Sequence, residues 1–169
     1  MNYIQTEGIS YTDNEWVFYP QIFVNTCIYI PLVIYQYVIG REGQTVDPKI
    51  LSKNANHNDK LVRSMINFSN TLADTDKNKF SYQRMESQIA YLSMLVYRSC
   101  LILQDKVWDK ILLEKFDRYL YNERKELYVQ LGKLRYRKYL PVRYVKFWRL
   151  IGKRFSLDWI YKIYRKLPK

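Results

Sequence analysis

The sequence predicts a mainly helical protein that carries one small β element. Three observations lead to this fold class. Apolar residues recur at helical spacing over most of the 169 residues, glycine and proline number five each, and one stretch is rich in β-branched and aromatic residues. A hydrophobic content of 48% is enough to form a core, and the length fits one domain. We therefore expect a small bundle of helices rather than a turn-rich β architecture.

The first helix is expected to begin after Thr12. The residues from Thr12 to Glu15 read TDNE, which fits a capping box: Thr12 is the N-cap and Glu15 occupies the third helical position. Apolar residues continue at helical spacing to Cys27. Pro20 interrupts this run, and we expect it to kink the helix or shorten it.

A β element is expected directly after this helix. Residues 28–39 are mostly β-branched or aromatic, and they predict one or two short strands broken at Pro31. Residues 40–45 contain two glycines and are expected to form a loop.

Three further helices are expected over residues 47–72, 81–104 and, from about residue 107, to residue 131. The first of them starts at Asp47-Pro48, because Pro suits the first helical position after an Asp cap. Residues 73–79 form a polar connector. Each helix has an apolar stripe that needs a neighbour to cover it. The stripes contain Leu51, Ala55, Val62, Met65 and Leu72; Met85, Ile89, Leu92, Val96 and Leu103; and Leu112, Phe116, Tyr119, Leu127 and Leu131.

The net charge of +12 is concentrated in the C-terminal tail. Residues 132–169 hold 13 of the 28 Lys and Arg residues and one acid, Asp158, which gives +12. The remaining 131 residues hold 15 basic and 15 acidic side chains and are neutral. Such an asymmetry is typical of a tail that meets a polyanion, either nucleic acid or an anionic membrane.

The tail is also the clearest amphipathic segment of the sequence. When successive residues of 141–155 are placed about 100° apart, apolar and basic side chains separate onto two faces. The basic face holds Arg143, Lys146, Arg149, Lys153 and Arg154. The apolar face holds Tyr144, Phe147, Trp148, Ile151 and Phe155. We expect residues 141–167 to lie on an anionic membrane surface, with this apolar face directed into the headgroups.

Two other partners fit the tail less well. Nucleic-acid binding needs only Lys and Arg against phosphates, but the aromatic face is better matched to lipid headgroups, so nucleic acid is not favoured. A helical module that docks its aromatic face on another protein is the remaining alternative. The first ten residues do not resemble a secretory signal, and the apolar stretch 27–39 is too short to span a bilayer. We expect a cytoplasmic protein that is peripheral on the inner face of the cell membrane.

Two segments near the N-terminus carry the candidate chemistry. Residues 8–16 read GISYTDNEW and place acids before an aromatic residue at a helix start. Residues 35–45 read YQYVIGREGQT and join a β-type stretch to an Arg/Gly loop. In this order they resemble the acceptor-side motif and the site-closing strand and loop of family 2 glycosyltransferases, which have the GT-A fold. The resemblance covers about residues 1–70.

The resemblance implies that the chain is the C-terminal part of a nucleotide-sugar-dependent transferase of surface polysaccharide synthesis. On this interpretation, residues 1–47 are an acceptor-side remnant of the GT-A catalytic domain. Residues 48–140 are the C-terminal helical region, and residues 141–169 are the basic amphipathic tail.

The resemblance also implies roles for individual residues. Asp13 matches the catalytic base, a carboxylate that removes a proton from the acceptor hydroxyl. Trp16 offers an aromatic face to a sugar ring, and Arg41 with the main chain around Gly43 holds the departing diphosphate. The implied acceptor- or diphosphate-binding residues are Glu15, Trp16, Arg41, Gly43, Gln44 and Thr45.

The sequence departs from the family in what it lacks. A complete enzyme has a nucleotide-binding half with an Asp-x-Asp metal site before these motifs, and this sequence does not supply it. Thr12 stands where the family often has a second acid. We therefore expect the chain to be inactive alone, to hold no cofactor, and to need another chain for the nucleotide-binding half. The complete enzyme would use Mg²⁺ or Mn²⁺ with its nucleotide-sugar.

Ordinary structural roles fit the same residues. Asp13 and Glu15 are what a well-capped helix places in its first turn. Trp16 suits a core position, and Arg41 in a glycine loop suits a solvated turn. His57 stands among polar residues and is expected to face solvent.

One histidine and two cysteines are too few for a structural zinc site with four ligands. Cys27 and Cys100 lie far apart in apolar surroundings and are expected to be buried free thiols.

Overall fold

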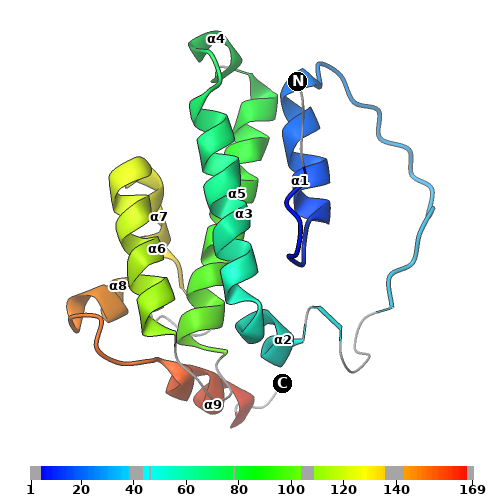
Figure 1. Ribbon diagram of the computed structural model, residues 1–169. Helices are drawn as coiled ribbons and strands as arrows, with labels where there is room; N and C mark the ends of the chain where they lie inside the picture. Colours follow the sequence, from blue (N-terminus) through cyan, green and yellow to red (C-terminus); the bar gives the residue numbers. More distant parts are fainter. Residues whose placement is uncertain are drawn as a thin grey trace.

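The computed structural model describes residues 5–38, 44–45, 47–77, 79–103, 109–135 and 143–166. Within these ranges every regular element is a helix (Figure 1). The two longest helices, α3 (Ala55–Asn70) and α5 (Phe80–Leu101), pack against each other and form the centre of the molecule.

The first helix ends earlier than its apolar pattern, which continues to Cys27, predicts. The α-helix α1 (Asp13–Phe18) passes directly into a 3-10 helix, η1 (Tyr19–Phe23), which packs on α5. The change occurs where Pro20 enters, because proline has no N–H to donate to the α-helical ladder. The expected shortening is confirmed, and the helical stretch ends before Cys27.

The predicted strands are not present. Residues 24–38 are extended and loop away from the helices (Figure 1), and no strand occurs among the described residues. The Leu32 N–H bonds to Ile30 O at 2.8 Å, which is a local contact and not a ladder. A strand needs neighbouring strands to be stable, and no described segment pairs with this one. The fold class is therefore mainly helical, and the prediction of a GT-A remnant with a small β element is wrong.

The predicted helix over residues 47–72 is two helices. Asp47 caps α2 (Pro48–Lys53) as expected, with its Oδ1 accepting from the Lys49 N–H at 2.8 Å. Asn54 then leaves the helical conformation (φ −99°, ψ 20°), and α3 begins at the next residue. The polar connector that follows contains one helical turn, α4 (Asp74–Lys77).

The predicted helix that ends at residue 131 is also divided. It forms α6 (Lys110–Glu123) and α7 (Lys125–Lys133), and the chain turns at Arg124 (φ −146°, ψ 67°). Asp109 caps α6 by accepting from the Leu112 N–H at 2.8 Å. The expected start at residue 107 lies outside the described residues.

The tail forms two short helices in place of one amphipathic helix over residues 141–155. They are α8 (Tyr144–Leu150) and α9 (Asp158–Lys166). Between them Gly152 (φ 73°) and Lys153 (φ 59°) adopt left-handed backbone conformations, which end α8 and redirect the chain. Residues 141 and 142 lie outside the described part of the chain.

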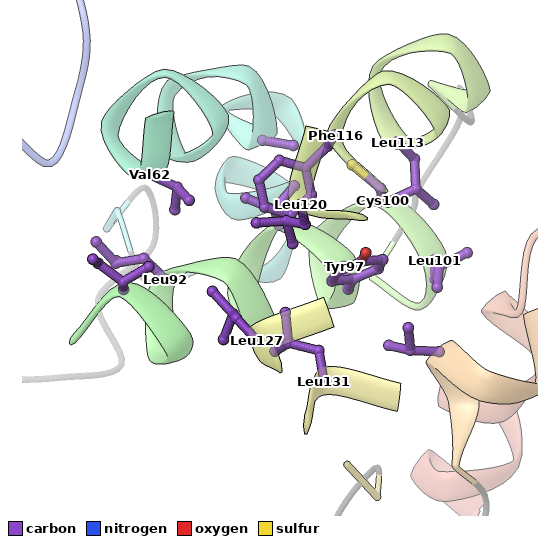
Figure 2. Packing of buried hydrophobic residues seen from close by; sticks show 14 of the residues in the cluster. Val62, Leu92, Tyr97, Cys100, Leu101, Leu113, Phe116, Leu120, Leu127 and Leu131 are labelled. Carbon is purple, nitrogen blue, oxygen red and sulfur yellow. The ribbon is translucent and has the colours of Figure 1, made fainter. Parts of the chain in front are cut away.

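One continuous core collects side chains from most of the helices (Figure 2). The predicted stripes are largely confirmed, since Val62 on α3, Val96 on α5 and Phe116 on α6 are all buried. Leu51, Leu72 and Leu112 are partly buried against the same cluster. The core also includes residues outside these three stripes. Tyr19, Tyr144, Trp148 and Ile160 come from the apolar patterns of the first helix and the tail, and Phe18, Ile22 and Leu157 were not predicted.

Candidate functional site

The head of α1 is fixed by a buried carboxylate. Glu15 is fully buried, and its two oxygens accept from the N–H (3.0 Å) and the Oγ1 (2.7 Å) of Thr6. Thr12 makes no side-chain cap bond, so the predicted capping box is wrong. Glu15 holds the N-terminal loop against α1. Its carboxylate is buried and does not face the solvent from which a sugar would bind.

Asp13 and Trp16 lie on the solvent side of α1. Asp13 is exposed, and its Oδ1 lies 3.4 Å from Asn14 Nδ2. The Trp16 side chain is 69% exposed, so the expected core alternative does not hold for this residue. Because they are three positions apart on a helix, the two side chains share one face.

The two motif segments are in contact with each other. The Tyr11 hydroxyl donates to Thr45 O at 3.0 Å, although the residues are 34 positions apart. Tyr11 has a left-handed backbone (φ 71°), which is uncommon for a residue other than glycine. Burial raises the pKa of Tyr11, so its hydroxyl remains a donor at neutral pH. Gln44 Nε2 donates to Val38 O at 2.6 Å, while Arg41 and Gly43 lie outside the described residues.

His57 contributes to the same junction and does not simply face solvent. Its Nδ1 accepts from the Ser10 N–H at 3.0 Å, and the ring is half-buried. Asn54 Nδ2 lies 3.4 Å from Ser10 Oγ. The start of α3 therefore fixes the loop that precedes α1.

A groove of about 730 Å³ runs between α1–η1 and α5. Its walls include Val17, Gln21, Val24, Phe80, Gln88 and Tyr91. The exposed part is mostly apolar, and the cations Lys79 and Arg84 stand along it. A mostly apolar hollow with a few polar groups is typical of a small-molecule site.

A hydrogen-bonded chain crosses the groove wall. Gln21 Nε2 donates to Gln88 Oε1 at 2.7 Å, and Gln88 Nε2 donates to Asn14 O at 3.1 Å. These bonds tie α5 to the turn of α1 that carries Asp13. Sequence reasoning missed the groove; the available signal was Val17, an apolar residue of α1 outside the stripe that faces the core.

No group of three or more His, Cys, Asp or Glu that suits a metal ion occurs within the described ranges. The divalent ion that a complete enzyme would use therefore has no such group of ligands among these residues. Among the described helices, none combines the length and apolar character needed to cross a membrane.

The predicted membrane face of the tail is divided by the structure. Tyr144 and Trp148 are buried in the core, so these two predictions are wrong. Phe147 and Phe155 are exposed, and Ile151 is half-buried. The reason is that α8 packs its aromatic side on the bundle, a use of an apolar face that helical periodicity alone does not distinguish from lipid contact.

A buried carboxylate on α6 anchors the tail. Asp117 accepts from Arg149 Nε at 2.8 Å, from Lys153 Nζ at 2.5 Å and from the Tyr97 hydroxyl at 2.5 Å. Burial, followed by the negative charge of Asp117, raises the pKa of Tyr97 well above its usual range, so the hydroxyl stays protonated. The sequence had placed Arg149 and Lys153 on the basic face of the tail, which was expected to meet anionic lipid.

The two cysteines differ in environment. Cys100 is buried as expected, whereas Cys27 is exposed at the start of the extended segment.

Comparison of the chain with protein-family models, with curated proteins and with solved structures found no match.

Proposed function

We propose that the chain provides the acceptor side and the general base of a nucleotide-sugar-dependent glycosyltransferase, and that another polypeptide segment provides the donor side. The observation that carries this proposal is the contact between the two motif segments. The hydrogen bond from the Tyr11 hydroxyl to Thr45 O brings residues 8–16, which include the exposed Asp13, into contact with residues 44–45.

The groove between α1–η1 and α5 is the proposed acceptor site. Val17 lines it and lies four residues after Asp13 on the same helical face, about 6 Å along the axis. The Asp13 carboxylate therefore stands near one end of the groove. Phe80 and Tyr91 are exposed along it and offer apolar faces to the C–H surfaces of a sugar.

The proposed chemistry is an inverting transfer. The Asp13 carboxylate accepts the proton of an acceptor hydroxyl while that oxygen forms a bond to the anomeric carbon of the donor. The bond from this carbon to the diphosphate breaks, and the nucleotide diphosphate leaves with the electron pair. A positioned base of this kind contributes about 10²–10⁴-fold to the rate.

The extended segment supports the need for another polypeptide segment. Residues 24–38 contain no Lys, Arg, Asp or Glu, and their apolar side chains are exposed at both odd and even positions, including Ile28 and Tyr29. In an isolated helical chain this exposure is unfavourable, because each large apolar side chain left in water forgoes about 1.5–3 kcal/mol. A segment that is apolar on both faces is typical of an interior strand. We infer that the polypeptide that binds the donor covers this apolar segment.

A nuclear magnetic resonance titration of the chain tests the acceptor site. Maltose, lactose and chitobiose serve as probes, and amide and indole N–H signals report the binding position. Shifts are expected at Trp16, Val17 and Tyr91. The indole of Trp159, on the other end of the molecule, is the internal reference (Figure 1).

Matched variants sharpen this test. Tyr91→Ala should weaken binding, whereas Tyr121→Ala, at a similarly exposed tyrosine on α6, should leave it unchanged. Asp13→Asn should leave binding nearly unchanged, because a base acts on proton transfer. The proposal is wrong if none of the sugars shifts the groove signals, or if Tyr91→Ala and Tyr121→Ala behave alike.

A further inference from the structure

Helices α8 and α9 each present an exposed face on which apolar and basic side chains alternate. On α8 this face holds Lys146, Phe147 and Leu150, together with Arg143 directly before the helix. On α9 it holds Trp159, Lys162, Ile163 and Lys166. Phe155 and Arg154 are exposed in the segment between the helices. The apolar side chains are large and accessible, with Leu150 74% and Phe155 65% exposed.

Both helices are held firmly on the core by their opposite faces. Trp148 of α8 is fully buried, and Arg149 bonds the buried Asp117. The segment before α9 is tied to the end of α5, because the Leu157 N–H donates to Leu101 O at 2.8 Å. The exposed face is therefore the outer surface of packed elements. Both helices lie at the end of the molecule opposite α4 (Figure 1).

The positive charge of this surface is largely uncompensated. Arg143, Lys146, Arg154 and Lys166 form no ion pair with another described residue. The acid in this segment, Asp158, is paired with Lys162 at 2.6 Å. Four cations next to exposed apolar side chains match a partner that offers both negative charge and an apolar interior.

We propose that this surface binds anionic lipid headgroups at a membrane. The lipid-binding surface consists of the exposed cations Arg143, Lys146, Arg154 and Lys166 and of the exposed apolar side chains of α8, α9 and the segment between them. Such surfaces combine insertion of apolar side chains at the headgroup level with attraction to negative lipids. A nucleic acid would engage the cations but offers no apolar layer to the leucine and phenylalanine. The proposal does not depend on the transferase function.

Vesicle co-sedimentation tests the apolar part of the surface. The probe is phosphatidylcholine vesicles in which about one third of the lipid is phosphatidylserine, compared with pure phosphatidylcholine. Phe155→Ser should lower the partition coefficient on the order of tenfold. Phe23→Ser is the matched control, because Phe23 is 66% exposed at the end of η1, far from α8 and α9 (Figure 1).

A second pair of variants tests the charged part. Lys146→Gln with Arg154→Gln should weaken binding by about fivefold per removed charge. Lys60→Gln with Lys115→Gln removes the same net charge from exposed positions on α3 and α6, and should have a much smaller effect. Added salt should reduce binding without abolishing it, because insertion of apolar side chains is not screened.

Three results would overturn the proposal. The first is equal behaviour of the variants within either matched pair. The second is equal binding to vesicles with and without phosphatidylserine. The third is binding to duplex DNA that collapses with salt, with no association with either vesicle, which would assign the surface to nucleic acid. Circular dichroism establishes that each variant is folded. The sugar titration tests the transferase proposal independently, so the failure of one proposal leaves the other unaffected.

Discussion

Replacement of Asp117 by alanine perturbs the most connected polar group of the bundle. Its side chain is 1% exposed and joins three elements, since Tyr97 comes from α5, Arg149 from α8 and Lys153 from the turn after α8. The variant leaves two cations without their carboxylate and the Tyr97 hydroxyl without its acceptor. We expect a large loss of stability and a loosening of α8.

The size of the stability loss depends on whether each cation can reach water once the carboxylate is removed. The Lys153 side chain is 33% exposed and can turn its ammonium group into water. The Arg149 side chain is 13% exposed and is held by Tyr128, through a bond to its carbonyl oxygen at 2.9 Å and by stacking 3.4 Å from its ring centroid. Removal of one partner from a buried pair costs about 3–5 kcal/mol, and with one cation able to escape we expect about 3 kcal/mol. That is a large part of the roughly 5–15 kcal/mol that stabilises a small domain.

Urea unfolding followed by circular dichroism measures this loss. Asp74→Ala is the matched control, because the Asp74 side chain is 97% exposed in its ion pair with Lys77 and should cost less than about 0.5 kcal/mol. The double variant Asp117→Leu with Arg149→Met should be more stable than Asp117→Ala, since it leaves no buried cation unpaired. A cost below about 1 kcal/mol for Asp117→Ala, or a double variant less stable than the single one, would refute this reasoning.

Three smaller effects follow from other sites. Iodoacetamide should alkylate the exposed Cys27 in the folded protein and Cys100 only in urea, because burial raises the pKa of Cys100 to about 12; equal rates by mass spectrometry would contradict this. The hydrogen bond from Lys162 lowers the pKa of Asp158, so the pair stabilises α9 above the usual carboxyl range and loses that effect as pH falls through the folded pKa. Asp158→Asn should therefore cost about 0.3–0.5 kcal/mol at neutral pH and nothing in acid, and a cost in acid measured by urea unfolding would argue against the pair. Gly152→Ala should lower the free energy of unfolding by about 1–2 kcal/mol, because a φ of 73° is unfavourable for a residue with a Cβ, although the added Cβ would lie 3.8 Å from the nearest atom. Unchanged stability in urea would show that the turn relaxes.

The core was predictable from the sequence, because burial follows helical periodicity. Val62, Val96 and Phe116 are buried where their stripes place them. The breaks at Asn54 and Arg124 were not predictable in the same way. Neither residue is proline or glycine, and the helices on both sides of each break pack on α5.

The candidate site was predictable in part. The family resemblance implied that residues 8–16 and residues 35–45 lie at one site, and the hydrogen bond between Tyr11 and Thr45 shows that parts of the two segments are in contact. The role of Glu15 was not predictable, because its partner Thr6 lies outside the capping pattern. The exposure of residues 24–38 was not predictable either. Their composition is typical of a strand that is covered on both faces, and the sequence does not show that such neighbours are missing from the fold.

The tail shows that an amphipathic pattern does not identify what its apolar face packs against. The same spacing that suited a membrane face places Trp148 in the core and directs Arg149 to the buried Asp117. Of the side chains that remain exposed, Phe147 and Phe155 belong to the predicted apolar face, whereas Leu150 was on neither predicted face. Docking on the bundle therefore determines which side chains of the tail stay exposed and are available for the proposed lipid contact.

The two proposed surfaces are joined by one rigid element. Helix α5 contributes Phe80 and Tyr91 to the groove, and its last residue, Leu101, accepts the hydrogen bond from Leu157 that fixes the segment before α9. At 1.5 Å per residue, the distance from Tyr91 to Leu101 is about 15 Å, and that from Phe80 to Leu101 is about 30 Å. A chain bound to a membrane through α8 and α9 would thus hold its groove within about 30 Å of the end of α5 to which the segment before α9 is bonded. An acceptor attached to a membrane lipid could reach a groove at that height, whereas a groove carried on a flexible tail would have no fixed height at all.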